Sequence, residues 1–245
     1  CFSKALGIMN EEVHLETARS LDNLGMMMWQ LDNYHKAEEY HKRALVIGMQ
    51  AVCDGHPAIG EFTTNLGVAM YYQGRLSEAE EQQHRALSIR EEALGNGHPE
   101  VGESLNNLAC VMSRQGKLPE AEECHKRALA IRKQSLHPVH PDIAMSLGWL
   151  GDLTYRQGRY LEAEAYHRGE LAILRQAFGC YHPRVAWSLF NLGLTVWHQG
   201  KLADAAEVLE TCIEVEKKVL GDDHIGVVFT LSHLELIREQ RDDND

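Results

Sequence analysis

The sequence predicts an all-α fold, an α-solenoid of stacked helix-turn-helix units. The first observation is a histidine that recurs every 42 residues, at His14, His56, His98, His140, His182 and His224. The second is a leucine ten residues after each of these histidines, with further apolar residues at helical spacing. The third is a proline or glycine where a helix should begin or end. Such a fixed period is typical of arrays in which each unit contacts its neighbours.

The first helix of each unit is predicted to be amphipathic. With the histidine counted as position 1, apolar residues occupy positions 4, 8, 11 and 15, which share one helix face at about 100° per residue. A proline follows four of the histidines, at Pro57, Pro99, Pro141 and Pro183. Proline suits the first helical position, where its missing N–H would have no partner. Position 12 is small, at Gly25, Gly67, Ala109, Gly151 and Gly193, which predicts close approach of a neighbouring helix.

The second helix of each unit follows a tight turn. Four turns read Gln-Gly-Arg or Gln-Gly-Lys, and their glycine can take the left-handed conformation that ends a helix. The first turn has Asp32-Asn33 instead, two residues that also tolerate this conformation. The second helices then share an alanine, at Ala37, Ala79, Ala121, Ala163 and Ala205.

The period divides the chain into units. Residues 1–13 are interpreted as the end of a preceding repeat, because Ala5-Leu6-Gly7-Ile8 is similar to Ala44-Leu45-Val46-Ile47 and the chain opens on Cys1. Five repeats are predicted at 14–55, 56–97, 98–139, 140–181 and 182–223. A terminal helix at 224–241 and an acidic tail at 242–245 complete the chain.

The composition and the absent motifs argue against several classes of function. A net charge of −12 argues against nucleic acid and anionic membrane surfaces, which both attract basic proteins. No apolar run approaches the roughly 18 residues of a membrane span. The six cysteines form no CxxC pair, so reduced thiols and a cytoplasmic protein are expected. Because phosphate-loop, HExxH and GxSxG motifs are absent and the histidines recur with the scaffold, we predict no enzyme, no cofactor and no metal.

The third repeat carries the family resemblance. Asn106-Asn107-Leu108-Ala109, Gln115-Gly116-Lys117, Glu120-Ala121-Glu122 and the run 126–132 (KRALAIR) resemble a tetratricopeptide repeat. The 42-residue period with His-Pro between units is similar to the longer repeats of kinesin light chain and nephrocystin-3-like proteins. This resemblance implies a right-handed solenoid whose first helices line a concave groove. Two features depart from kinesin light chain: no heptad coiled coil precedes the repeats, and the groove is mixed in charge rather than strongly basic.

The candidate groove residues lie at positions opposite or beside the core stripe. The resemblance assigns the recurring Asn23, Asn65, Asn107 and Asn191 to the backbone of a bound peptide, since an amide both donates and accepts hydrogen bonds. Arg114 and Arg156 are candidates for binding an acidic group. Trp149, Trp187 and Trp197 are candidate apolar anchors, because tryptophan is enriched in binding hot spots. Tyr155 and Phe229 complete the predicted site. The alternatives are that the asparagines support neighbouring helices, that the aromatic rings are buried between helices, and that the arginines are ordinary exposed charges.

The predicted function is a protein-interaction scaffold that binds a peptide or a helix of a partner in its groove. A kinesin light chain-like cargo adaptor is the finer interpretation. A regulatory or sensor segment of a larger multidomain enzyme is one alternative. Self-association through the apolar surface of the C-terminal repeats is another.

Overall fold

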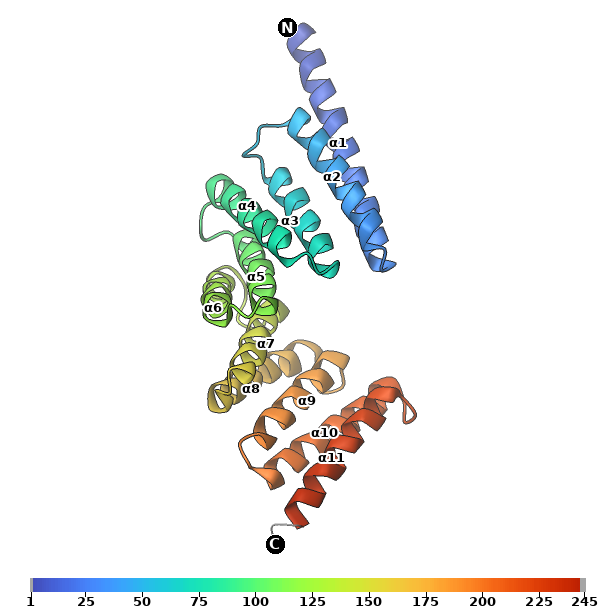
Figure 1. Cartoon of the computed structure of the whole chain (residues 1–245), viewed down its shortest axis with the longest axis vertical. Coiled ribbons are helices and arrows are strands. Elements are labelled where there is room, and N and C mark those ends of the chain that lie inside the picture. Colours follow the sequence, from blue (N-terminus) through green and yellow to red (C-terminus); the bar gives the residue numbers. More distant parts are fainter. Residues whose placement is uncertain (1, 243–245) are drawn as a thin grey trace. The chain divides into compact units, whose positions relative to one another are not determined.

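The computed structural model describes the backbone of residues 2–242 and the side chains of residue 12 and residues 14–242. Helices are the regular secondary structure of this part of the chain, so the all-α prediction is confirmed (Figure 1). The helices are α1 (Phe2–Gln30), α2 (Tyr34–Ala51), α3 (Pro57–Tyr72), α4 (Leu76–Leu94), α5 (Pro99–Arg114), α6 (Leu118–Ser135), α7 (Pro141–Arg156), α8 (Tyr160–Phe178), α9 (Pro183–Trp197), α10 (Leu202–Leu220) and α11 (Ile225–Asp242). None of these helices is long and apolar enough to cross a membrane.

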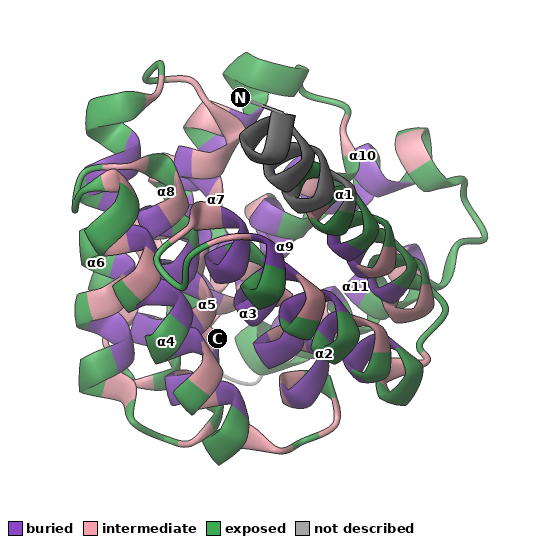
Figure 2. Ribbon diagram, turned by 90° about the horizontal axis from the view of Figure 1, so that it is seen from above, coloured by how far each residue is buried: buried purple, intermediate pink, exposed green. Residues whose placement is uncertain are grey.

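The chain divides into two compact units, Cys1–Ile131 and Arg132–Asp245. In the first unit each helix from α1 to α5 packs against the next, and in the second unit the same holds from α7 to α11. Their cores contain residues of the predicted apolar stripes, such as Leu66 in one unit and Leu192 in the other. Figure 2 shows that most helices carry buried residues along one side and exposed residues along the other. This pattern is what an amphipathic helix in a stack requires.

The recurring histidines cap helices. His56, His98, His140 and His182 each precede a proline, and each accepts a hydrogen bond through Nδ1 from the backbone N–H two residues later. This bond satisfies a donor that the first helical turn leaves without a partner. His224 does the same for Gly226. The histidines therefore mark helix starts by direct contact with the backbone.

The first repeat differs from the others at its start. Helix α1 runs without interruption through His14, so the boundary predicted between residues 13 and 14 falls inside one helix. The predicted end of a preceding repeat, at 1–13, lies mostly outside the described side chains. Of the predicted acidic tail at 242–245, the structure describes only Asp242.

The predicted close approach at position 12 is confirmed. A Cβ atom on Gly25 would lie 2.5 Å from the His41 ring, and a Cβ on Gly67 would lie 2.5 Å from Nε2 of Gln83. In the second unit a Cβ on Gly151 would lie 2.6 Å from Nδ1 of His167. Each glycine therefore leaves room for a large side chain from the second helix of its own repeat.

Two leucines of the core stripe are exposed. The Leu24 side chain is 40% exposed and Leu231 is 37% exposed, whereas Leu66, Leu108, Leu150 and Leu192 are buried. Leu24 lies on α1 and Leu231 on α11, the first and last helices of the stack in the described chain. The prediction of burial was wrong there because a repeat buries its apolar stripe only when helices pack on both sides.

Three of the Gln-Gly-Arg and Gln-Gly-Lys turns, at residues 73–75, 115–117 and 199–201, link a repeat to the one before it. The glycines take positive φ, +79° at Gly74 for example, as predicted. Nε2 of Gln73 and Nη1 of Arg75 donate to opposite oxygens of Glu38 on α2, at 2.8 and 2.7 Å. Gln115 and Lys117 likewise donate to opposite oxygens of Glu80, whereas Gln199 and Lys201 both donate to Oε2 of Glu164. The sequence reveals these turns as helix stops but not as inter-repeat links.

This link at Glu38 predicts acid sensitivity. Burial raises the pKa of Glu38, but hydrogen bonds from Lys42, Arg75 and Gln73 outweigh burial and lower it from 4.5 to about 2. The stabilisation is therefore complete above pH 4.5 and is lost as the pH falls towards 2. We expect Glu38→Gln to remove about 1–2 kcal/mol of this pH-dependent stability, measured by urea unfolding at pH 6 and pH 3. Glu39→Gln, at an exposed neighbouring position, is the control, and an equal effect of both variants would contradict the assignment.

Candidate peptide-binding site

The second unit contains an open pocket between α7 and α9, with α8 behind it. Its volume is about 330 Å³. The lining residues are Met145, Gly148, Trp149, Asp152, Glu170, Pro183, Arg184, Trp187 and Asn191. Three of them, Trp149, Trp187 and Asn191, belong to the predicted groove.

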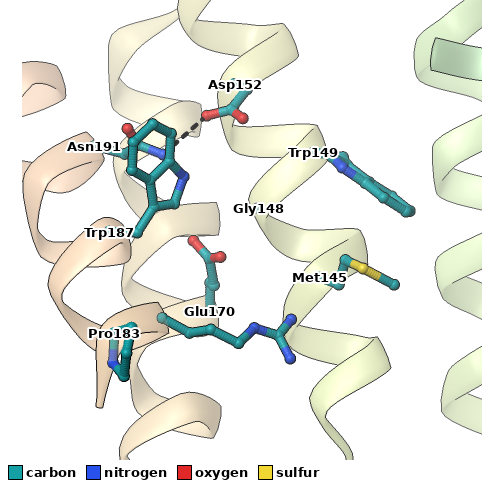
Figure 3. A pocket seen from close by; sticks show the side chains of 9 residues that line it. Met145, Gly148, Trp149, Asp152, Glu170, Pro183, Trp187 and Asn191 are labelled. Atoms are coloured by element: carbon teal, nitrogen blue, oxygen red, sulfur yellow. Dashed lines mark hydrogen bonds between the residues drawn. The ribbon is translucent and has the colours of Figure 1, made fainter. Parts of the chain in front are cut away.

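Helical spacing explains why these side chains meet. Met145, Trp149 and Asp152 are spaced by four and three residues on α7, so they share one face of that helix. Trp187 and Asn191 are spaced by four residues on α9 and lie on the facing side of the pocket. Figure 3 shows Trp187 beside Asn191, whereas Trp149 and Met145 project from α7 away from Trp187. The two tryptophans therefore do not enclose the pocket between their rings.

A buried carboxylate forms the floor of the pocket. Glu170 on α8 is only 8% exposed, and its Oε2 accepts a hydrogen bond from the Ser188 hydroxyl at 3.0 Å. A Cβ on Gly148 would lie 2.6 Å from Oε1 of Glu170, so this glycine lets the carboxylate approach α7. Sequence reasoning missed Glu170. The available signal was that the equivalent residue is alanine in each of the three preceding repeats.

A second carboxylate and a buried imidazole adjoin this floor. Nδ2 of Asn191 donates to Oδ1 of Asp152 at 3.4 Å, the contact drawn in Figure 3. Partial desolvation in the pocket raises the pKa of Asp152 to about 6, against the lowering effect of nearby His167. His167 is 1% exposed, and its ring nitrogens lie 3.5 Å from Oε2 of Glu170 and 3.8 Å from Oδ1 of Asp152. The polar part of the pocket is therefore dominated by carboxylates.

Other predicted residues of this unit lie outside the pocket lining. Nε1 of Trp197 donates to Oε1 of Gln240 at 2.8 Å, and the ring packs against the apolar core. The Tyr155 hydroxyl contacts Nδ1 of His198 at 3.2 Å. Phe229 is 55% exposed, with its ring 4.5 Å from that of His233. Arg156 is exposed at the last residue of α7.

In the first unit, the chain's own groups contact several predicted residues. Nδ2 of Asn65 donates to Oδ2 of Asp22 at 2.8 Å, and the other oxygen of Asp22 lies 2.6 Å from Nδ1 of His41. Arg114 donates to the Tyr71 carbonyl at 3.2 Å and lies over its ring. Asn65 thus supports a neighbouring helix, which is the alternative stated for the asparagines. Arg114 is exposed and contacts Tyr71 on α3, a contact that neither interpretation of the arginines included.

The two remaining asparagines of this unit are more open. Asn23 is exposed and lines a pocket of about 280 Å³ together with Arg19, Asp22, Glu61 and Phe62. Asn107 is half-buried on α5. Its neighbour Asn106 is buried, and its Oδ1 accepts a hydrogen bond from Nδ1 of His125 at 2.9 Å.

Comparison with known proteins identifies the repeat. Family models described as tetratricopeptide repeat match residues 17–58, 60–134, 106–177 and 142–218. The chain belongs to the tetratricopeptide repeat family. Tetratricopeptide repeat scaffolds typically bind proteins and are generally not catalytic. No match was found among curated proteins.

Solved structures share this tetratricopeptide fold at low sequence identity. A Podosopora anserina protein with nearly identical TPR-like repeats, described as a kinesin light chain candidate, is 24% identical with a TM-score of 0.74, covering 84% of this chain and 97% of that one. BtubC (BKLC) from P. vanneervenii is 21% identical with a TM-score of 0.72, over 87% of this chain and 91% of its own. Apo RapI is 17% identical with a TM-score of 0.72, over 91% and 84%. These likenesses establish the fold alone.

Proposed function

We propose that this chain is a protein-interaction scaffold that binds an extended peptide or a helix of a partner on the face formed by α7 and α9. The observation that carries the proposal is Trp187, which is 64% exposed at the edge of an open pocket. A large aromatic side chain exposed beside polar groups is typical of a binding hot spot. Pockets that combine apolar walls with a few polar groups are the usual form of ligand sites.

The polar groups suit an extended segment. Asn191 lies at the pocket with an amide that can both donate to and accept from a peptide backbone. Asn23 and Asn107 occupy the same repeat position on α1 and α5, so the proposal extends this role to them. Arg156, exposed at the end of α7, remains the candidate for an acidic group of the partner.

Three finer functions remain as alternatives. A cargo adaptor is favoured by the likeness to repeats described as a kinesin light chain candidate. A regulatory segment is favoured by the likeness to the aspartyl phosphate phosphatase F of Bacillus subtilis, 17% identical with a TM-score of 0.74 over 94% of this chain and 56% of that one. Self-association is favoured by α11, where Ile225 is 75% exposed and Phe229 is 55% exposed. A mass that rises with protein concentration in light scattering would support this third function.

Trp187→Ala tests the proposed surface. We expect the variant to lose at least about tenfold of the parent's affinity for its partners, because a hot-spot tryptophan supplies a large share of binding energy. Affinity-captured partners of the parent and the variant are compared by quantitative mass spectrometry and then titrated individually. Leu161→Ala is the matched control, since Leu161 is 73% exposed on α8 and outside this pocket. Equal recovery with parent and Trp187→Ala would exclude the α7–α9 face.

A further inference from the structure

We propose that the pocket between α7 and α9 binds a lysine or arginine side chain of the partner, with Glu170 and Asp152 as its counter-ions and Trp187 as its apolar wall. This inference rests on the proposed function and adds the chemistry of the partner. It is independent of the family's recurring features, because Glu170 and Asp152 are particular to the fourth repeat and Trp187 to the fifth.

Glu170 departs from the packing of the other repeats. The equivalent residues of the first three repeats are Ala44, Ala86 and Ala128, each with 0% exposure. The scaffold therefore needs only a small apolar side chain at this place. A carboxylate that is 8% exposed costs free energy unless a partner compensates its charge. Its presence here indicates a role other than helix packing.

A second difference from the first three repeats, the glycine at position 148, makes room for Glu170. The residue at the position of Gly148 has a polar side chain in the first three repeats, as Asp22, Thr64 and Asn106. In the fourth repeat the side chain is absent from α7, and a carboxylate enters from α8 instead. With both differences present, the place of a packed helix contact is taken by the acidic floor of a cavity.

The buried charge between successive repeats also changes sign at this point. Nη1 of Arg132 donates to the Ser146 hydroxyl at 2.8 Å and to the Asp142 carbonyl at 3.0 Å. One repeat later the corresponding serine, Ser188, donates to Glu170. A buried cation is thus followed by a buried anion. The anion lines the pocket between α7 and α9, and Arg132 is not among the residues of that lining.

The pocket has an excess of negative charge. Among the described side chains, neither Glu170 nor Asp152 forms an ion pair with a lysine or an arginine; both lie near the His167 ring, at 3.5 and 3.8 Å. Arg184 is the basic residue of the lining, and its guanidinium lies 5.7 Å from the Phe178 ring. Two carboxylates and one guanidinium favour a further cation and repel an acidic side chain.

The Trp187 ring can pack against both the methylene groups and the charged head of a long basic side chain. Lysine and arginine pack their methylene groups on apolar surface and keep the charged head near polar groups. A cation close to an indole face gains further attraction from the ring. A cavity of about 330 Å³ accommodates such a side chain. The charged head would then lie near Asp152 and Glu170.

Selection from a library of random displayed peptides tests the inference on the full 245-residue chain. Peptides that bind the parent and lose binding to Trp187→Ala are sequenced and titrated by fluorescence anisotropy. We expect these peptides to share a lysine or an arginine whose replacement by alanine weakens binding about tenfold. Glu170→Gln and Asp152→Asn should each cause a loss of similar size. Glu235→Gln, an exposed carboxylate on α11, should not.

The outcomes separate the two proposals. Failure to select any Trp187-dependent peptide would overturn the proposed function together with this inference. Trp187-dependent peptides that share no basic residue, or that bind Glu170→Gln and Asp152→Asn as tightly as the parent, would overturn the inference alone. Glu170→Gln keeps the side-chain size and an oxygen for Ser188, and circular dichroism confirms that the variants fold. Asp152→Asn is the second variant, because its side chain is 52% exposed and bears little of the packing.

Discussion

Replacing Asp22 by alanine should lower the free energy of unfolding of the first unit by about 3–4 kcal/mol. Asp22 is 4% exposed and connects three helices, since its oxygens contact His41 on α2 at 2.6 Å and Asn65 on α3 at 2.8 Å. Alanine would leave both of these groups without their acceptor. A buried polar group that loses its partner keeps its full desolvation cost, which is why the expected loss is large. Urea unfolding followed by circular dichroism measures it.

Two further variants make this result specific. Asp54→Ala removes an exposed aspartate before α3 and should change stability by less than about 0.5 kcal/mol. Asp22→Asn should lose less than Asp22→Ala, because Asn106 already contacts His125 in the same way at the equivalent position of the third repeat. Equal stability of Asp22→Ala and Asp54→Ala would show that the Asp22 contacts do not hold these helices together.

Gly151→Ala should destabilise the second unit by about 2–3 kcal/mol although alanine is the better helix former. The new methyl group would lie 2.6 Å from Nδ1 of His167, whose ring is 1% exposed and enclosed by packed helices. The overlap forces α7 and α8 apart, and this cost exceeds the gain in helix propensity of about 1 kcal/mol. Thermal or urea unfolding of the variant gives the difference.

Gly102→Ala is the matched control for this substitution. Gly102 is also a buried helical glycine, but a Cβ there would meet Ile131 at an ordinary 3.5 Å. We expect this variant to be neutral or slightly stabilised. The double variant Gly151→Ala/His167→Ala should recover part of the loss, because it removes the ring that the methyl group meets. A stable Gly151→Ala variant would refute close packing of this pair of helices.

Much of the fold was predictable from local chemistry. Proline after histidine predicts a helix start, and glycine in the Gln-Gly-Arg and Gln-Gly-Lys turns predicts a helix end; the structure has both. The small residues at position 12 predicted a close helix contact, and Gly25 and Gly151 make it. These features depend on the backbone conformation and on residues near in sequence, so a single chain reveals them.

The site was predictable only in part. Counting positions from the histidines placed Trp149, Trp187 and Asn191 on one predicted groove, and all three line one pocket. The reason is that helical spacing decides which side chains share a face. Counting positions did not reveal that Trp197 would bind Gln240, or that Arg114 would lie on Tyr71. Those contacts join residues of different repeats, and their geometry depends on how the helices pack.

The sequence alone determined the repeat, and for most helices it determined the boundaries and the exposed or buried face, since each follows from periodicity and from capping chemistry. The start of α1 is the exception. Only the tertiary structure decided that Glu170 forms the floor of a pocket. In the sequence Glu170 is one of many glutamates on a second helix. Its burial depends on the missing side chain of Gly148 on another helix and on the Ser188 hydroxyl of the next repeat. The physical reason is that burial and charge environment arise from contacts between distant residues, whereas periodicity reports only on one helix at a time.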